Sequence, residues 1–382
     1  MASTYKTFSN NDLVTTRTLL HEVIPITGSI VSGTYVEGTT NETNIKNYSH
    51  GMFQSVYDYP YLSSSANHIL DITVGYSADS ALSNSAPLTQ QMQEKKINIY
   101  SQMAQMLVGF DHTGAIRPFD RDGDLTGGNK IKEAFFLSFA RLLTKDEIQK
   151  NTFRMSFATG AQTANADIRF LNPMTVGDFG ADTAFKVNSP AGEYGILFAT
   201  QSSTITYPAD DSQAAGILAG HSFPVGLIYY QAGVAVISGS VFNSTNIGGI
   251  LNSTSSVVMG SPAHPGMDAS GFNFISGSEI SSSADAIRAR IYNVSFNNTI
   301  ELNSTIYFCR INHNEYNYSS NPTYLSGSEI RVKTNRTDPP ISYITSIGLY
   351  SSDNQLLAVG KLSEPVRKDS NIELTFRARL DY

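Results

Sequence analysis

Three aspartates at alternate positions, Asp120, Asp122 and Asp124, are the residues whose types and spacing most resemble a metal-binding motif. Carboxylates at the first, third and fifth positions of a loop are the first ligands of a calcium site. The same loop has Leu125 at the sixth position, where glycine is expected, and Ile131 at the twelfth, where a bidentate carboxylate is expected. An Asp/Gly turn is the simpler interpretation, and a structural ion at the three aspartates stays an open alternative.

Other segments resemble catalytic motifs but lack an essential member. HEVIP begins at His21, but Pro25 replaces the second histidine of a zinc-protease helix. The SGS triplets that begin at Ser238, Ser276 and Ser326 lack the second glycine of a nucleophile elbow. GDLTGGNKI resembles a phosphate loop, yet an asparagine separates its glycine from its lysine, so we expect a turn that leads into a helix. We predict no catalytic residue, no cofactor and no enzyme activity, although distant loops can still assemble a glycosidase carboxylate pair.

The composition excludes some classes of function. Lys and Arg number 26 against 33 Asp and Glu, for a formal net charge of −7, which opposes nucleic-acid binding through phosphate neutralisation. Charged residues make up 15% of the chain, below the usual share of about 25%. The single cysteine, Cys309, cannot form an internal disulfide, and its apolar neighbours in STIYFCRI predict a buried structural thiol.

Neither an export signal nor a membrane span is predicted. The first residues, MASTYKTFSNNDL, are polar and lack the apolar core of a signal peptide. The most apolar long segment, VGLIYYQAGVAVISGSVF at 225–242, contains three glycines and Gln231, which argue against a spanning helix. Its two apolar runs on either side of Gln231, Ala232 and Gly233 predict a buried β-hairpin instead.

Two amphipathic helices are expected in the N-terminal half. In the first, at 88–110, apolar residues recur at steps of three, four and seven, and Gly109 is a stop signal. In the second, at 130–151, Ile131, Phe135, Phe139 and Leu142 repeat this spacing. The apolar face of the first helix comprises Met92, Ile99, Met103, Leu107 and Phe110.

From residue 153 onward the pattern is typical of β-strands. TFRMSFATG and GEYGILFATQ are short strand candidates, and 238–285 is a segment of Ser/Gly/Asn-rich loops. STIYFCRI is apolar on both faces, which predicts a central strand, and ISYITSIGLY and QLLAVGKL predict a hairpin. In NIELTFRARLDY the alternation places Leu374, Phe376, Ala378, Leu380 and Tyr382 on the inner face. This last strand must be covered by its own sheet or by a partner, since a bare edge strand aggregates.

These patterns predict a mixed α+β fold that is predominantly β. We expect a helix pair in the N-terminal half and an antiparallel, β-sandwich-like C-terminal domain. The predicted segments are an N-terminal α+β region at 1–152, a β-rich middle region with loops at 153–285, and an antiparallel β domain at 286–382.

The C-terminal hundred residues resemble a known family. VSFNNTIELNSTIYFCRINHNEYNYSSNPTYLSGSEIRV, ISYITSIGLY, LLAVGKLSEP and LTFRARLDY are similar to a virion structural protein of contractile-tailed, myovirus-type phages of marine bacteria, cyanobacteria among them. KINIYSQMAQMLVGFD, LLTKDEIQK and VNSPAGEYGILFA extend the resemblance over most of the chain. The hairpin at 341–365 also resembles attachment domains of tail-fibre and baseplate proteins.

The resemblance implies a structural component of the virion, at the tail baseplate or tail periphery, assembled in the host bacterial cytoplasm. Its implied partners are other virion proteins and copies of itself, without direct nucleic-acid binding. It implies neither a cofactor nor catalytic residues. Alternatives are a head–neck component, a secreted carbohydrate-active enzyme, and a receptor-binding or fibre protein. The last would contact host glycans through the loops at 238–285 or the Tyr/Asn stretch at 312–324, with Tyr316 and Tyr318.

Overall fold

The chain divides into two compact units, which we describe separately. Unit 1 comprises Met1–Leu20 and Glu301–Tyr382, and unit 2 comprises His21–Ile300. Strands β1 (Leu13–Thr27) and β17 (Ile291–Ile311) contribute residues to both units. The computed structural model describes residues 5–27, 35–37, 40–84, 90–125, 127–128, 130–158, 173–199, 223–242, 275, 279–319, 321–327, 329–331, 333, 335 and 337–382.

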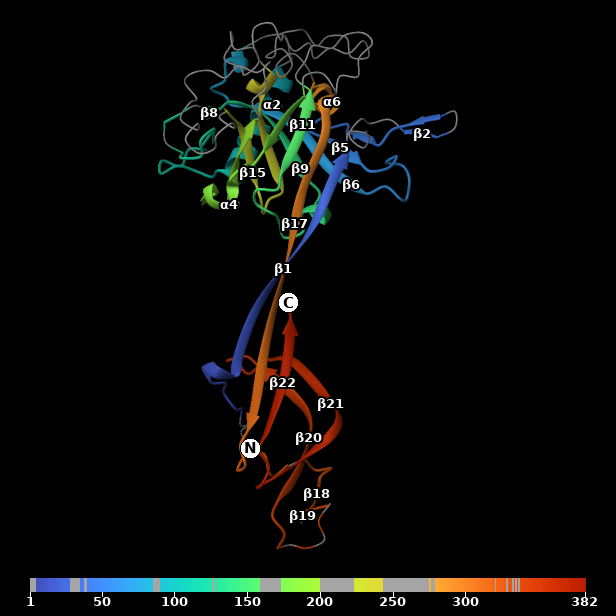
Figure 1. Cartoon of the computed structure of the whole chain (residues 1–382), viewed down its shortest axis with the longest axis vertical. Coiled ribbons are helices and arrows are strands. Elements are labelled where there is room, and N and C mark those ends of the chain that lie inside the picture. Colours follow the sequence, from blue (N-terminus) through green and yellow to red (C-terminus); the bar gives the residue numbers. More distant parts are fainter. Residues whose placement is uncertain are drawn as a thin grey trace. The chain divides into compact units, whose positions relative to one another are not determined.

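A large antiparallel sheet organises unit 2 (Figure 1). Its strands lie in the order β17, β11, β12, β14, β15, β16, β9, β6, β5 and β4, with β1 beyond β17. Their bounds are β4 Ile45–Asn47, β5 Gln54–Tyr57, β6 His68–Tyr76, β9 Glu133–Phe139, β11 Arg154–Ala158, β12 Pro173–Gly177, β14 Gly192–Ala199, β15 Phe223–Tyr229 and β16 Val234–Ser238.

Short strands and helices complete unit 2. The short strands are β2 Tyr35–Glu37, β3 Thr40–Glu42, β7 Phe119–Asp120, β8 Lys130–Ile131, β10 Glu147–Ile148 and β13 Lys186–Ser189. The helices are α2 Gln90–Leu107, α3 Arg141–Thr144, α4 Ala181–Ala184 and α6 Ile280–Arg290, with 3-10 turns at Ala81–Asn84 and Gly239–Phe242.

The first predicted helix is confirmed as α2. Ile99 and Leu107 of its predicted apolar face are buried, while Phe110 lies beyond the helix end and is exposed. Gly109 has a φ of +85° and its N–H donates to the Ala104 carbonyl at 3.0 Å, as a glycine that ends a helix does. The helix packs closely on β6. A Cβ at Gly75 would lie 2.7 Å from the Lys96 carbonyl oxygen.

The second predicted helix, at 130–151, is wrong. This segment forms β8, β9, α3 and β10, and Phe135 and Phe139 lie in β9. β9 is a central strand between β6 and β16, buried on both faces, so its apolar run has no period that separates it from a helix. The aromatic residues favour the strand, and the loop GDLTGGNKI leads into β8 rather than into a helix.

The apolar segment at 225–242 forms the predicted buried hairpin. Strands β15 and β16 pair in the register Tyr229↔Val234 to Gly226↔Ile237. Gly233 closes the turn with a φ of +66°, a conformation that glycine adopts without a steric penalty. Within the described residues, no helix has both the length and the apolarity needed to cross a membrane.

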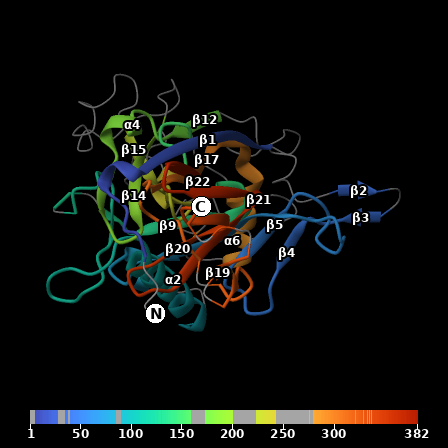
Figure 2. The ribbon, with the colours of Figure 1, turned by 90° about the horizontal axis from the view of Figure 1, so that it is seen from below.

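Unit 1 is built from two antiparallel strand pairs (Figures 1 and 2). β22 (Leu374–Asp381) pairs with β17 from Ser304↔Asp381 to Ile311↔Leu374, and β20 (Ile341–Tyr350) pairs with β21 (Leu356–Asp369). β17 lies between β1 and β22, so STIYFCRI is central as predicted. The alternation along β22 is also confirmed, although its inner residues are half-buried and Tyr382 is 70% exposed. Unit 1 also contains β18 (Leu325–Ser326), β19 (Glu329–Ile330) and the 3-10 turn Asn10–Asp12.

The predominantly β, mixed α+β class is confirmed, but the division into units differs from the three expected segments. The boundaries expected at 152/153 and 285/286 fall inside unit 2, since β11 of the middle segment pairs with β17 of the last. The residues of the main hydrophobic core all lie between Ile26 and Phe296 in the sequence, and so belong to unit 2. Long-range strand pairing therefore sets the units, and composition along the chain does not reveal it.

Candidate functional site

A cavity of about 580 Å³ lies in unit 1, lined by residues far apart in the sequence. The N-terminal segment supplies Tyr5 and Phe8, β17 supplies Phe308 to Ile311, and β20 supplies its second half. Tyr316, Phe376 and the turn after β20, with Ser351, Ser352 and Asn354, also line it. The lining is mainly apolar and aromatic, which suits an apolar ligand or side chains of another protein.

Aromatic rings at the N-terminal segment hold it against the strands of unit 1. The centroids of Tyr5 and Tyr350 are 4.7 Å apart, and those of Phe8 and Tyr307 are 5.5 Å apart. A Cβ at Gly348 would lie 2.9 Å from the Tyr350 ring and 3.2 Å from Leu356, so glycine allows both side chains to cover β20 there.

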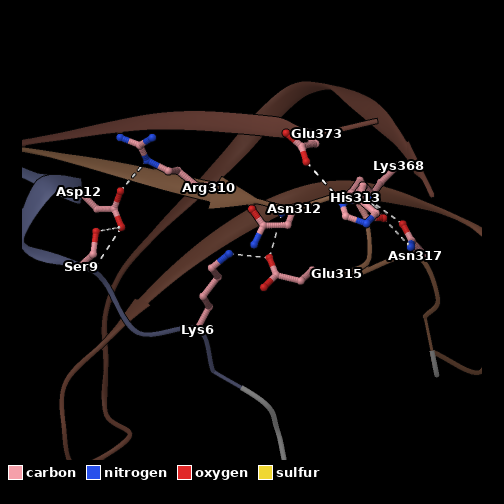
Figure 3. Close-up of polar contacts among 10 residues, drawn as sticks. All are labelled: Lys6, Ser9, Asp12, Arg310, Asn312, His313, Glu315, Asn317, Lys368 and Glu373. Carbon is pink, nitrogen blue, oxygen red and sulfur yellow. Dashed lines mark hydrogen bonds and ion pairs between the residues drawn. The ribbon is translucent and has the colours of Figure 1, made fainter. Parts of the chain in front are cut away.

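Ion pairs fix the polar edge of the cavity (Figure 3). Arg310 Nε donates to Asp12 Oδ1 at 2.6 Å, and Ser9 Oγ and N donate to Asp12 Oδ2 at 2.7 and 3.0 Å. These hydrogen bonds, those from Ser9 first, hold the pKa of Asp12 below its usual value. Lys6 Nζ lies 2.5 Å from Glu315 Oε2. Because these charged groups are paired within unit 1, the cavity favours a neutral occupant.

A buried lysine holds the Tyr/Asn stretch against β21 (Figure 3). Lys368 Nζ donates to the His313 carbonyl at 3.0 Å, to Asn317 Oδ1 at 2.6 Å and to the Asp369 carbonyl at 2.8 Å. Three acceptors match the three donors of an ammonium group, which offsets its desolvation. Tyr316 and Tyr318 are exposed on this fixed loop.

Cys309 is half-buried and lines the cavity, so the prediction of a buried thiol needs correction. The described part of unit 1 does not cover this face of β17 fully. Burial, with a smaller effect of the Asp12 carboxylate, raises the pKa of the thiol. A raised pKa lowers the thiolate fraction, which opposes a nucleophilic role.

Unit 2 brings together the three aspartates for which a structural ion was the open alternative. One oxygen from each of Asp120, Asp122 and Asp124 lies within 4.8 Å of the others. Asp120 Oδ2 accepts hydrogen bonds from Lys130 Nζ at 2.8 Å and from the Leu125 N–H at 2.7 Å. Burial raises the pKa of Asp120, and Lys130 opposes that rise. A calcium loop usually has glycine at its sixth position, because the backbone there has a positive φ. Leu125 occupies this position and adopts a φ of +64°, so the absence of glycine does not argue against an ion site.

Among the described residues of unit 2, the buried carboxylate of Asp178 has a structural environment. Asp178 Oδ1 accepts from Arg154 Nη1 at 2.9 Å, and Oδ2 accepts from Tyr230 Oη at 3.0 Å and the Asn151 N–H at 2.7 Å. Burial raises the pKa of Asp178 to about 6, against the lowering effect of these donors. Both oxygens already have protein donors, so this cluster ties the residues that follow β12 and β15 to the start of β11 rather than presenting an acid or base to a substrate.

Where the structure describes them, the remaining catalytic motifs form no site. His21 lies in β1, where Nδ1 is 3.3 Å from the Asn298 carbonyl oxygen, and Pro25 lies in the same strand. Ser238 ends β16 and Ser326 ends β18, whereas Ser276 lies outside the described residues, as does most of 238–285. Lys96 is buried, and its ammonium donates to the Ile275 carbonyl. Burial lowers the pKa of Lys96 to about 7.

Sequence reasoning missed the aromatic residues of the N-terminal segment. Tyr5 and Phe8 stand three residues apart in a polar segment, whose pattern indicates only that the apolar core of an export signal is lacking. Their role depends on pairing with Tyr350 and Tyr307, which no local pattern shows.

Comparisons of the chain with protein-family models, with curated proteins and with solved structures found no match.

Proposed function

We propose that the chain is a non-enzymatic structural subunit of a tailed bacteriophage particle, at the tail baseplate or tail periphery. Unit 1 is the part that assembles with other subunits, either copies of this chain or other virion proteins. The resemblance of the sequence to a virion protein of contractile-tailed phages supports the proposal that the chain is part of a phage particle. The surface of unit 1 supports the assembly role.

The observation that carries the proposal is the distribution of apolar side chains in unit 1. Within its described residues, Ile341 and Leu349 are the only buried apolar side chains. Large apolar side chains are exposed on β1, on β20 and β21, and in the Tyr/Asn stretch. They include Leu13, Val14, Leu19, Leu20, Tyr316, Tyr318, Tyr343, Tyr350, Leu356, Leu357 and Val359.

Such a surface is unusual for a protein that acts alone. Monomeric proteins rarely expose contiguous apolar patches above about a few hundred Å², and larger patches mark interaction sites. Stable interfaces have an apolar, aromatic centre and a polar rim. The hairpin surface, which we define as Tyr350, Leu356, Leu357 and Val359, consists of exposed apolar side chains at the turn end of β20 and β21.

The test is to charge the hairpin surface. Leu357 is 68% exposed and Val359 is 64% exposed, so Leu357→Asp with Val359→Asp removes little packing within the chain. We expect the wild-type chain to form an oligomer, and the double variant to dissociate, by light scattering coupled to size exclusion. Ser363→Asp, at an exposed polar position of β21, is the control and should leave the oligomer intact. A monomeric wild-type chain that is absent from purified particles would refute the proposal.

A second function, receptor binding, is favoured by one observation. Tyr316 and Tyr318 are 46% and 53% exposed on a loop that Lys368 fixes, and rigid exposed aromatic rings suit stacking on sugars. Binding of the wild-type chain on a glycan array, lost with Tyr316→Ala and Tyr318→Ala, would favour this role over assembly alone.

A further inference from the structure

The loop between β7 and β8 in unit 2 concentrates carboxylate oxygens around one point. Asp120 ends β7, and Asp122 and Asp124 follow it at alternate positions. Oxygens from all three lie within 4.8 Å of one another. Three oxygens with this spacing lie within about 2.8 Å of a common point, close to the calcium–oxygen distance of about 2.3–2.6 Å, so a small inward movement of the side chains lets one ion contact all three.

A buried oxygen without a donor is the second, independent observation. The side chain of Asp120 is 1% exposed, and its Oδ2 is taken by Lys130 and Leu125. Its Oδ1 is also buried and accepts no hydrogen bond from the residues that the structure describes. A buried acceptor without a partner is unfavourable, and a carboxylate more so, because desolvation is not offset.

The orphan oxygen faces the rest of the cluster. A Cβ built on Gly128 would lie 3.6 Å from Asp120 Oδ1 and 3.3 Å from Asp122 Oδ2, so both oxygens border the same small space beside this glycine. Gly128 has a φ of +64°, which glycine adopts readily. A larger residue would fill the space that the two carboxylates share.

The loop is held in place from outside the cluster. The Gly123 carbonyl accepts hydrogen bonds from Tyr194 Oη and from Asn188 Nδ2, each at 3.1 Å. These side chains belong to β14 and β13, so the sheet fixes the loop with its carboxylates close together. Close carboxylates repel each other unless a proton or a cation lies between them.

We propose that Asp120, Asp122 and Asp124 bind a divalent cation, and that this cation is calcium. Calcium prefers carboxylate and carbonyl oxygens and accepts irregular geometry, whereas magnesium requires shorter distances and a near-octahedral shell. Ile131, at the twelfth position of a calcium loop, is buried in β8 and supplies no ligand. The site is therefore a three-carboxylate site whose remaining ligands come from water or the main chain.

The experiment titrates calcium into the full chain after removal of divalent ions with a chelator, by calorimetry at physiological ionic strength. We expect saturable binding of one ion per chain. The paired substitutions Asp122→Asn and Asp124→Asn should weaken binding about tenfold or more, since ligand charge sets calcium affinity. Asp353→Asn, in the exposed turn between β20 and β21, removes the same kind of charge and should leave binding unchanged.

Two further measurements keep the outcome decisive. Calcium should raise the unfolding temperature of the wild-type chain and of Asp353→Asn, but not that of the paired variant, since a ligand that binds only the folded state stabilises it. If the paired variant does not fold, Asp124→Asn alone replaces it, because Asp124 is exposed. No saturable calcium binding by the wild-type chain, equal binding by the variants, or tighter binding of magnesium would overturn the proposal.

Discussion

At the scale of single residues, buried charge is the clearest feature of the molecule. Asp178 accepts hydrogen bonds from Arg154, Tyr230 and the Asn151 N–H, and Lys368 donates to three acceptors in unit 1. Both oxygens of Asp178 have donors, and the three N–H groups of Lys368 have three acceptors. Asp120 differs, because one of its oxygens has no hydrogen-bond donor among the described residues. This contrast separates structural charges from the candidate ion site.

The raised pKa of Asp178 predicts a pH dependence of stability. Burial raises this pKa to about 6 from 3.8, so the folded state binds the proton more tightly than the unfolded state. The associated stabilisation, at most about 3 kcal/mol, is present at low pH and is lost as the pH rises through about 6. Relative to Asp178→Asn, the wild-type chain should therefore gain stability from about pH 7 to about pH 5.

Urea unfolding of the wild-type chain and of Asp178→Asn at both pH values measures this difference. The comparison with the variant removes the contribution of the other carboxylates, such as Asp111, whose pKa is lowered by hydrogen bonds from Thr113 and Ala115. A stability difference that does not change between the two pH values would contradict the assigned role of burial.

At the scale of elements, close approach of backbones positions the helix of unit 2. A Cβ at Gly75 in β6 would lie 2.7 Å from the Lys96 carbonyl oxygen and 2.8 Å from the Tyr100 N, both in α2. Tyr100 in turn donates its hydroxyl to the Ile131 carbonyl at 2.6 Å, beside the loop that carries the aspartates. The position of α2 therefore helps to fix β8, which follows the loop of the candidate ion site.

Gly75→Ala should destabilise unit 2 by about 1–3 kcal/mol, since the clashing atoms are backbone atoms that cannot move without displacing α2. Gly51→Ala is the matched control. Gly51 has a φ of +63° and open space around it, so only backbone strain of about 1 kcal/mol applies. Thermal and urea unfolding compare the two variants. Equal stability of Gly75→Ala and the wild-type chain would show that α2 is not held by this contact.

At the scale of the whole molecule, the two units differ in how they bury apolar surface. The core cluster runs from Ile26 to Phe296, whereas the described part of unit 1 buries only Ile341 and Leu349 among its apolar residues. Unit 2 has the core that an independently stable domain needs. Unit 1 has backbone pairing without a comparable core, so we expect its stability to come from association.

Hydrogen exchange tests this difference in stability. In the wild-type chain, amides of β20 and β21 should be protected in the assembled state. In the variant with Leu357→Asp and Val359→Asp, these amides should exchange faster, while those of β6 and β9 keep their protection. Equal protection of β20 and β21 in both proteins would show that unit 1 is stable without partners.

The sequence by itself determined the elements whose signals are local. α2 with its stop at Gly109, the hairpin of β15 and β16, and the alternation of β22 follow from the period of apolar residues and from glycine at turns. The spacing of Asp120, Asp122 and Asp124 also indicated a candidate site. The positive φ of Leu125 could not be predicted, because leucine rarely adopts this conformation.

Only the tertiary structure decided the rest. β9 is a strand because β6 and β16 pair with its two edges, and the burial of both of its faces removes the alternation by which a sequence reveals a strand. The cavity of unit 1 joins Tyr5 to Tyr350, and the orphan oxygen of Asp120 depends on which side chains surround it. Contacts between residues hundreds of positions apart leave no periodic trace in a single sequence, so these features require the fold.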